Sequence, residues 1–572
     1  MNVVKNRSPQ FWFSLSLLIP LYFGIVAFGF YLNHPYLVQD DARHHVVWLQ
    51  KFADDRLFPR DFIADYFYTV APAGYKFFYW AIAQMGVGAI SAAKIVPTVL
   101  ALIATIAIFK ISIKIFDRPE AAFLSVLIFN ENVWMNDDLI SATPRAFLYP
   151  IFAFFIYFSM ERSPAGCSLT IALLGLFFPQ FLFVTLAMLT LQLLDIKIQP
   201  PYLSLSKNKE NYLVWISGFS IAAIAILIFA SQLAPLGEAI TSQQMNVMPE
   251  FGPHGRVEYF GVNPFSFIFD GNSGLNLPLY PFPILSGLAL PVLLKYRLSE
   301  TQSITPKVKI LFDLLVAALG LFILAHIFLF KLYFPSRYTY HSLIFILAIA
   351  SGIVLCITWD DLHSKHGILD FNLKILLVIA LILPFLPIAP FIFQGWVVGE
   401  HPELYQFFAA QPPDSLTASL ADEADNLPAF SRRSVLVSRE FAIPHHVKYY
   451  QEIERRTVDL VRSQYSSDPD DIVQFIERYR IQFWLLESHF NRADYLSEKS
   501  WLVNSSFNDI IFETVEKLEQ NRPLAILPFA ERCAVFSDSQ FTVLDTTCLL
   551  EFSGGGQNSI SSSTADVENL GN

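Results

Sequence analysis

The stretch FWFSLSLLIPLYFGIVAFGFYL, from Phe11 to Leu32, decides the fold class of this chain. It is apolar almost throughout, and at about 1.5 Å per residue a helix of this length covers the roughly 30 Å of bilayer hydrocarbon. Lys5 and Arg7 precede it, and no small-residue cleavage site follows it. The stretch is also longer than the apolar part of a signal peptide, so we expect an uncleaved membrane anchor.

The composition of the whole chain is that of a polytopic membrane protein. Of its 572 residues, 54% are hydrophobic, 15% are aromatic and only 16% are charged, whereas a soluble domain carries about 25% charged residues. The shortage of charge and the net charge of -11 argue against a disordered chain, a coiled coil and a nucleic-acid-binding protein. Four cysteines are too few for a disulfide-dense scaffold or a Cys-rich zinc module.

Further apolar runs of spanning length follow the first one. The predicted spans lie at 89–109, 119–134, 146–160, 212–233, 277–294, 310–330, 338–358 and 372–394. The run 167–194 is broken at Phe178-Pro179-Gln180, and because Pro removes a helical hydrogen-bond donor, we expect a hairpin of two short helices there. The chain as a whole is predicted to be an α-helical polytopic membrane protein of about 10–12 spans.

The distribution of basic residues predicts the orientation, because cytoplasmic loops accumulate Lys and Arg. The basic groups are Lys5 and Arg7; Lys110, Lys114 and Arg118; Lys197, Lys207 and Lys209; and Lys295, Arg297, Lys307 and Lys309. All four groups lie on the same side of the membrane only if the run 167–194 crosses it an even number of times. The N-terminus is then cytoplasmic, and the loops 33–88, 135–145 and 234–276 face the periplasm or lumen.

The composition changes after residue 395, which divides the chain into a transmembrane domain, 1–395, and a soluble outer domain, 396–555. Strands are predicted at 416–420, 434–438 and 482–487, and helices at 445–463 and 469–479, which together indicate a small α/β layer. Cys533 and Cys548 flank a predicted hairpin, where they either form a disulfide on an oxidising face or stay as two thiols. The tail 556–572, rich in Gly, Ser and Asn, is predicted to be disordered.

The strongest functional signal is VQDDARHH, Val38 to His45, directly after the first span. The adjacent carboxylates of Asp40 and Asp41 can bind a divalent cation such as Mg or Mn, or deprotonate a hydroxyl group. Alternatively, Asp40 caps an amphipathic helix and Asp41 interacts with the helix dipole. Asp41 and His45 are four residues apart and share a helix face, so Asp40, Asp41 and His45 are candidate metal ligands, although no third ligand for a dedicated zinc site is recognisable.

Two other outer segments each place an arginine at the start of a helix that runs back into the membrane. Arg145 follows Thr143 and Pro144, which are suited to a helix start, and Arg337 lies in FPSRYTYH, from Phe334 to His341. A guanidinium beside free helix N–H groups is a good phosphate site, so both are candidate phosphate-binding residues. Interfacial snorkelling or pairing with lipid head groups explains the same arginines. Possible substrate or metal contacts are His44, His45, Asp137, Asp138 and Tyr338.

Other patterns are less specific. Asp65-Tyr66-Phe67-Tyr68 mixes a carboxylate with aromatic rings, as sugar sites do, but an aromatic belt at the lipid interface is the simpler explanation of the rings. The loop 234–276 is long enough to be a lid or a binding segment. The chain contains no P-loop, GxSxG, HExxH or paired CxxC motif, which weakens any interpretation as a pump, a serine hydrolase or a metalloprotease.

The order of these features resembles the GT-C superfamily of polytopic membrane glycosyltransferases: an outer acidic motif after the first span, many further spans and an outer C-terminal α/β domain. The resemblance implies a transferase that moves a sugar, with inversion, from a polyprenyl-phosphate carrier in the bilayer to a glycan, lipid or protein acceptor on the noncytoplasmic face. Asp40 and Asp41 match the first-loop acidic motif. Arg145 and Arg337 would hold the phosphate of the donor.

Two other functions compete with this interpretation. A transporter or flippase for a lipid-linked or anionic solute would use the arginines to bind cargo and the carboxylates to sense protons. It is expected to carry ionisable residues deep within several spans, and His326 is the clearest such residue. A noncatalytic membrane scaffold whose outer domain binds a partner is the third possibility.

Overall fold

The computed structural model describes residues 8–196, 203–296, 303–329, 331–364, 368–386 and 395–552. Two sets of predictions fall outside these residues, namely the basic residues Lys5, Arg7, Lys197 and Arg297 and the disordered tail 556–572. The chain divides into two compact units. Unit 1 comprises residues 1–53, 68–235 and 263–398, and unit 2 comprises 54–67, 236–262 and 399–572. The segments 54–67 and 236–262, which the sequence places in outer loops of the membrane region, therefore pack within unit 2.

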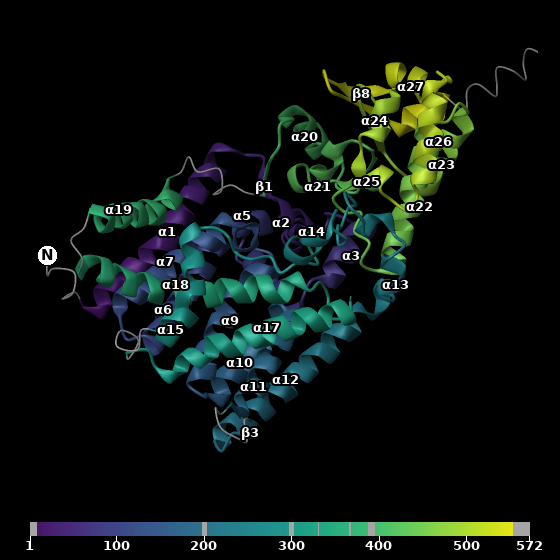
Figure 1. Ribbon diagram of the computed structural model, residues 1–572. Coiled ribbons are helices and arrows are strands. Elements are labelled where there is room, and N and C mark those ends of the chain that lie inside the picture. The colour runs from purple at the N-terminus through teal and green to yellow at the C-terminus, as the bar shows by residue number, and fades with distance from the viewer. Residues whose placement is uncertain are drawn as a thin grey trace, which may run out of the picture. The chain divides into compact units, whose positions relative to one another are not determined.

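Unit 1 is a helical bundle (Figure 1). Its longer helices are α1 (Pro9–Asn33), α4 (Ala73–Gln84), α6 (Val96–Ile115), α7 (Pro119–Met135), α9 (Pro144–Met160), α10 (Pro164–Phe177), α11 (Leu182–Gln192), α12 (Lys209–Leu233), α17 (Lys309–Ile327), α18 (Ser336–Ser364) and α19 (Ile368–Ile382). Its shorter elements include α2 (Asp40–His45), η1 (Val47–Phe52), α5 (Ala89–Ala93), α8 (Asp137–Ile140), α14 (Pro264–Phe269), η5 (Phe282–Ala289) and α15 (Leu290–Tyr296). The strands β1 (Leu37–Gln39) and β4 (Trp396–Val398) pair antiparallel, as do β2 (Leu194–Ile196) and β3 (Leu203–Leu205).

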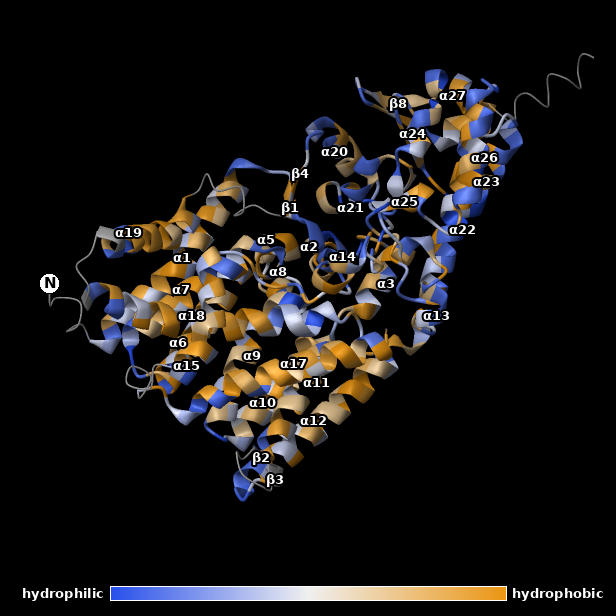
Figure 2. Ribbon diagram, in the orientation of Figure 1, coloured by the Kyte–Doolittle hydropathy of each residue, from blue (hydrophilic) through white to orange (hydrophobic). Residues whose placement is uncertain are grey.

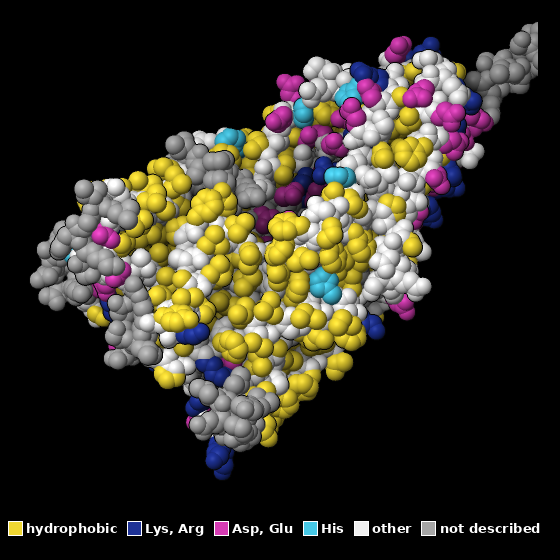
Figure 3. Space-filling view, in the orientation of Figure 1, with side chains coloured by type: hydrophobic (Ala, Val, Ile, Leu, Met, Phe, Trp, Pro, Cys, Tyr) yellow, Lys and Arg dark blue, Asp and Glu magenta, His cyan; other side chains and the backbone are white. Residues whose placement is uncertain are grey.

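The helices of unit 1 have the apolar surface of membrane segments. Five are long and apolar enough to cross a bilayer among the described residues: Pro9–Asn33, Ala89–Ile115, Lys209–Leu236, Pro306–Ile327 and Ser336–His363. Shorter apolar helices are Pro144–Met160, Pro164–Phe177, Pro179–Gln192 and Phe282–Tyr296. Figure 2 shows that the ribbons of α10, α12 and α17 consist largely of hydrophobic residues, and Figure 3 shows hydrophobic side chains covering the same part of the surface. The predicted helical membrane region is confirmed, whereas the count of 10–12 spans stays a prediction.

The broken run 167–194 forms the predicted pair of short helices. α10 ends at Phe177 and a 3-10 turn at Pro179–Phe181 leads into α11. A Cβ on Gly175 would contact Ala225 of α12 and come within 3.7 Å of Leu182, and a Cβ on Gly218 would lie 2.8 Å from both Ile171 and Leu189. α10 and α11 thus run in opposite directions along α12, which is the geometry of a hairpin.

One end of unit 1 collects predicted cytoplasmic residues. Lys114 and Lys307, from two different basic groups, both pair with Glu161, at 3.2 Å and 2.6 Å. Arg118 pairs with Asp360 at 2.9 Å. These contacts place the predicted inner loops together, as one membrane face requires, while the side of the membrane stays a prediction.

Unit 2 contains a five-stranded sheet and the helices that cover it. The sheet order is β6-β5-β7-β9-β8, and β5 pairs parallel with β6 and β7 while β9 pairs antiparallel with β7 and β8. The strands are β5 (Leu416–Ala418), β6 (Ser434–Val435), β7 (Phe483–Glu487), β8 (Ala534–Ser537) and β9 (Phe541–Asp545). The main helices are α3 (Phe62–Val70), α20 (Pro402–Ala409), α22 (Val447–Gln464), α23 (Pro469–Tyr479), α24 (Ala493–Ser497), α25 (Ser500–Val503), α26 (Asn508–Glu519) and α27 (Ile526–Arg532).

The alternation of side chains along β7 explains how the sheet is covered. Trp484 points to one face, where its Nε1 donates to Gln464 of α22 at 3.0 Å and its ring packs on Phe475 of α23. Its neighbour Phe483 points to the other face and contacts Phe408 of α20. The three strands and two helices predicted for this region therefore exist in the predicted order.

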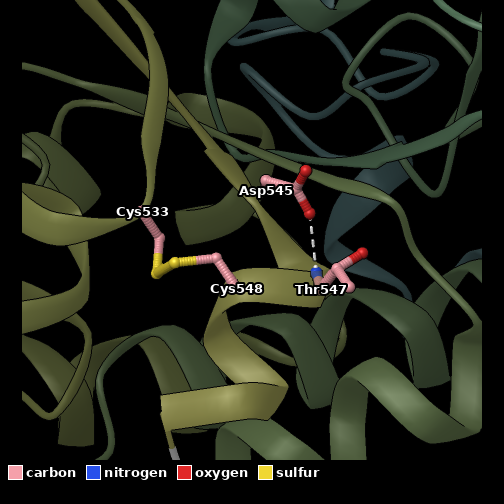
Figure 4. Close-up of a disulfide and its surroundings, with 4 residues drawn as sticks. All are labelled: Cys533, Asp545, Thr547 and Cys548. Atoms are coloured by element: carbon pink, nitrogen blue, oxygen red, sulfur yellow. Dashed lines mark hydrogen bonds between the residues drawn. A yellow bond between two sulfur atoms is a disulfide. The ribbon is translucent and has the colours of Figure 1, made fainter.

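Cys533 and Cys548 form a disulfide around the β8–β9 hairpin (Figure 4). Beside it, the Asp545 carboxylate accepts the Thr547 N–H at 2.7 Å, which turns the chain after β9 towards Cys548. Of the two possibilities left open by the sequence, the disulfide is the correct one.

The first two rings of the aromatic run at 66–68 are not accessible to a sugar. Tyr66 and Phe67 are buried in unit 2, and Tyr66 stacks on Tyr449 with ring centroids 3.6 Å apart. The alternatives of sugar contact and lipid belt both required exposed rings, so neither describes these two residues.

Candidate active site

The acidic motif forms the short helix α2, which the β1–β4 ribbon holds in place. The Asp40 N–H donates to the Gly395 carbonyl at 2.7 Å, just before β4. Gln39 caps the helix, because its side chain accepts the Ala42 N–H at 3.2 Å. The expectation that Asp40 is the cap is therefore wrong, and the carboxylates of Asp40 and Asp41 have other partners.

Asp41 and Asp138 both bind Arg145. One amino group of the guanidinium lies 2.8 Å from Asp138 Oδ1, and the other contacts Asp41 Oδ2. Asp138 is only 1% exposed, and its second oxygen accepts the Tyr149 hydroxyl at 2.9 Å and lies 3.4 Å from Nδ1 of His341. Arg145 thus joins the two acidic segments, and its charge is matched by carboxylates of the protein.

A left-handed turn between α8 and α9 sets the angle of this ion pair. Ala142 has φ of 53°, which is costly for a residue with a Cβ and is kept only when the surroundings enforce it. The hydroxyls of Tyr75 and Tyr79 donate to the Ala142 carbonyl at 3.2 Å and 3.0 Å. α9 then begins at Pro144 after Thr143, as predicted.

Arg337, at the start of α18, has a different environment from Arg145. Within the described part of the chain its side chain makes no hydrogen bond or ion pair, and its Nε is buried without a partner. Its charge nevertheless acts on Asp137, Asp138 and His45, so it lies among them. Of the two candidate phosphate-binding arginines, Arg337 is the one whose guanidinium is not occupied by carboxylates.

Burial controls the protonation of the groups around Arg337. Burial raises the pKa of Asp137, Asp40 adds to this shift, and Arg337 opposes it. Burial and then Asp137 raise the pKa of Asp138, while the charge of Arg337 and the hydrogen bond from Tyr149 oppose the shift. Burial lowers the pKa of His45 to about 3, with contributions from His44 and Arg337, so His45 is neutral at pH 7.

Asp40 is the most accessible carboxylate of the motif. Its side chain is 47% exposed, and Oδ1 contacts the Arg43 guanidinium within the same helix. Asp137 lies close enough for the charge of Asp40 to act on it. A Cβ on Gly395 would also lie 3.1 Å from the Cβ of Asp137, so the ribbon brings α2 and α8 together.

The structure gathers most of the predicted site residues in unit 1. We call them the Arg337 cluster: Asp40, Asp41, His45, Asp137, Asp138, Arg145 and Arg337. His44 lies next to His45, with ring centroids 6.2 Å apart. Tyr338 instead directs its buried hydroxyl to the Leu332 carbonyl. The roles of these residues stay predictions.

Three members of this environment are absent from the sequence-based candidates: Tyr149, Tyr340 and His341. Tyr340 interacts electrostatically with Asp137, Asp138 and both arginines. The signal was present, because Tyr149 lies four residues after Arg145, and Tyr340 and His341 lie three and four after Arg337. Residues at these spacings share a helix face, so periodicity around each arginine would have found them.

The described residues contain no group of three His, Cys, Asp or Glu side chains that could hold a metal ion by themselves. Mg²⁺ usually needs only one or two carboxylates, together with water and substrate phosphates. Asp40 and Asp137 fit that requirement better than Asp41, whose carboxylate binds Arg145. The predicted metal-ligand set of Asp40, Asp41 and His45 stays a prediction, in which the carboxylate of Asp41 already contacts Arg145.

A scan against models of protein families finds none that matches this chain, and a search of curated proteins finds no match. Solved structures do match. The apo crystal structure of the Archaeoglobus fulgidus oligosaccharyltransferase has a TM-score of 0.53 and 12% identity, over 90% of this chain and 73% of that chain. Archaeal oligosaccharyltransferase AglB from the same organism, in complex with an inhibitory peptide and a dolichol-phosphate, has a TM-score of 0.50 and 13% identity, over 90% and 72%.

At this level of identity the likeness concerns the fold. The overall architecture expected from the first-loop motif and the order of spans is confirmed at that level, because the likeness extends over 90% of this chain. This chain has the fold of that enzyme.

Proposed function

We propose that this protein is a membrane glycosyltransferase that moves a sugar from a polyprenyl-phosphate carrier to an acceptor hydroxyl or amide on the noncytoplasmic face, with inversion. The observation that carries the proposal is Arg337, a guanidinium without an ion-pair partner in the described chain, set among the carboxylates of two outer segments. The fold supports the proposal, since one of the matching structures contains a dolichol-phosphate.

The proposed step is a direct displacement at the anomeric carbon. A carboxylate takes the proton of the acceptor, the acceptor atom bonds to the sugar, and the bond between the sugar and the phosphate breaks. The leaving phosphate keeps the electron pair, so positive charge beside it lowers the barrier. Attack from the side opposite the phosphate inverts the configuration.

The geometry favours a distinct role for each charged residue. Asp40 serves as the base, because its carboxylate is the most accessible of the motif. Arg337 binds the phosphate. Arg145 holds Asp41 and Asp138 in place rather than binding substrate, because both carboxylates already contact it. In the alternative role, Asp40 and Asp137 would together hold a divalent cation, which would supply further positive charge to the phosphate in place of general-base catalysis by Asp40.

The test is sugar transfer in membranes from a polyprenyl-phosphate donor, with and without divalent cations. Asp40→Asn and Arg337→Ala should each lower the rate by about 10² or more, in line with the loss of a general base or an electrostatic clamp. Arg337→Lys should recover only part of the rate, because an ammonium cannot bind phosphate in the two-point manner of a guanidinium.

Matched controls lie at the opposite end of unit 1, where Arg118 and Asp360 form an ion pair. Arg118→Ala and Asp360→Asn remove the same kinds of charge and should leave transfer within about twofold of wild type. Unchanged transfer by Asp40→Asn would contradict the catalytic role. Movement of a lipid-linked solute across the membrane without any transfer would favour a transporter.

A further inference from the structure

Unit 2 contains a small polar cavity at the carboxyl ends of its parallel strands. The cavity measures about 260 Å³. Three lining residues follow the parallel strands: Asp422 comes after β5, Arg439 after β6, and Glu487 is the last residue of β7. In the sheet order the chain passes from β5 to β6 on one side and from β7 to the β8–β9 pair on the other, so the connections after the neighbouring strands β5 and β7 run in opposite directions. Ligands of open α/β sheets bind at such a switch point, outside the carboxyl ends of the strands.

The charges inside the cavity are already matched to one another. Lys499 is 9% exposed and lies 3.2 Å from Asp422 and 3.4 Å from Glu487. Its ammonium group also lies 4.4 Å from the centre of the Tyr495 ring. Over the whole lining, the carboxylates of Asp422, Glu487 and Glu498 stand against the cations of Arg439 and Lys499, which leaves a negative excess of one charge and disfavours a phosphate or a carboxylate as the ligand. The carboxylates retain free acceptor positions, because each carries about four lone-pair sites.

A buried hydrogen-bond donor lines the same cavity. Trp501, at the start of α25, is 4% exposed, and its Nε1 has no partner among the described residues. A buried N–H without an acceptor is unfavourable, because the group has lost its hydrogen bonds to water, so the N–H needs an acceptor. A ligand that fits must accept from Trp501 and donate to carboxylates. A hydroxyl group does both with a single atom.

We propose that this cavity binds one neutral sugar residue. Its volume lies just below the roughly 300–1,000 Å³ of sites for drug-sized ligands, so it fits a single monosaccharide rather than a longer glycan. Neighbouring hydroxyls of the sugar donate to Asp422 and Glu487 and accept from Trp501. The inference adds a sugar-binding site in unit 2 that is separate from the Arg337 cluster of unit 1.

Binding can be measured without any transfer reaction, so its failure is distinguishable from failure of the proposed function. The full-length protein is placed in a detergent without a sugar head group, and neutral methyl glycosides are tested by saturation-transfer difference NMR. Wild type should give signals from one or more neutral glycosides that saturate with concentration. Trp501→Phe, which keeps an aromatic ring but removes the N–H, and Asp422→Asn should each weaken binding at least tenfold.

Two variants of unit 2 serve as controls. Asp494→Asn changes an exposed acid of α24 that pairs with Arg492 outside the cavity, and Trp484→Phe changes a tryptophan whose N–H is already bonded to Gln464. Both should bind glycosides as wild type does. The proposal is overturned if no neutral glycoside binds, if only anionic sugars or amides bind, or if Trp501→Phe and Asp422→Asn bind as tightly as these controls.

Discussion

Replacing Arg145 should mainly lower the stability of the protein, whereas replacing Arg337 should mainly lower sugar transfer. The Arg145 guanidinium is 16% exposed and contacts Asp41, 23% exposed, and Asp138, 1% exposed. Arg145→Met leaves both carboxylates without their cation. Removing one partner of a buried ion pair costs about 3–5 kcal/mol, and the partial exposure of Asp41 favours the lower end of that range.

Arg337→Met should have the opposite profile. The guanidinium has no ion-pair partner in the described chain, and its Nε is buried without a hydrogen bond, so little stabilisation is lost. The expected change in the free energy of unfolding is below about 1.5 kcal/mol. Sugar transfer, in contrast, should fall by about 10² or more, because the phosphate loses its positive charge.

The assay is the apparent Tm of purified protein in detergent, followed by intrinsic fluorescence, beside the transfer rate in membranes. At roughly 2 °C per kcal/mol, Arg145→Met should lower the apparent Tm by about 6–10 °C, whereas Arg337→Met should change it by less than about 3 °C. Arg145→Lys should be intermediate, because one ammonium cannot bind two separate carboxylates as a planar fork does. Equal loss of stability in Arg145→Met and Arg337→Met would refute this division of roles.

Three further predictions concern other parts of the chain. Glu131 of α7 is fully buried, and neither of its carboxylate oxygens has a hydrogen-bond partner among the described residues. Glu131→Met should therefore raise the apparent Tm by the equivalent of about 1–3 kcal/mol. A lower Tm would show that the carboxyl has a stabilising partner. Burial raises the pKa of Asp61 despite hydrogen bonds from the N–H groups of Ile63 and Ala64. The protonated Asp61 therefore contributes fully to the stability of the folded state below the unfolded pKa of about 3.9, and this contribution is lost as pH rises through the folded pKa. The Tm of wild type minus that of Asp61→Asn should therefore decrease from pH 4 to pH 7, and a constant difference would contradict the raised pKa. The disulfide closes a loop with a sequence separation of 15. Replacing Cys533 and Cys548 together by Ser should therefore lower the free energy of unfolding by about 3 kcal/mol, which is measured as a lower apparent Tm of unit 2. An unchanged Tm would mean that the hairpin needs no cross-link.

Local patterns in the sequence were sufficient for much of the fold. The apolar runs, the Pro179 break and the period-2 strand at 482–487 are each determined by neighbours in sequence, because propensity and amphipathicity act over a few residues. The hairpin around Cys533 and Cys548 belongs to the same class. The membrane region and the order of elements in the α/β domain were therefore predictable.

The partners of the charged residues were not predictable in the same way. Asp41 and Arg145 are 104 residues apart, from 145 minus 41, and nothing in either segment specifies that they meet. The same holds for the helix cap, where Gln39 outcompetes Asp40 because the ribbon with β4 fixes where α2 starts. The charged residues of the site were therefore predictable from the sequence. Which arginine is bound by carboxylates and which has no ion-pair partner in the described chain was not.

The ribbon of β1 and β4 has a consequence for how the protein is made. The N–H of Asp40 is held by the carbonyl of Gly395, which is synthesised 355 positions later, from 395 minus 40. At a translation rate of about 5–20 residues per second, the first segment waits roughly 20–70 s for its partner. During that time the ribosome-bound chain already carries its acidic motif but lacks the strand that orders it, so a product terminated before β4 would contain Asp40 and Asp41 without the ribbon that positions them.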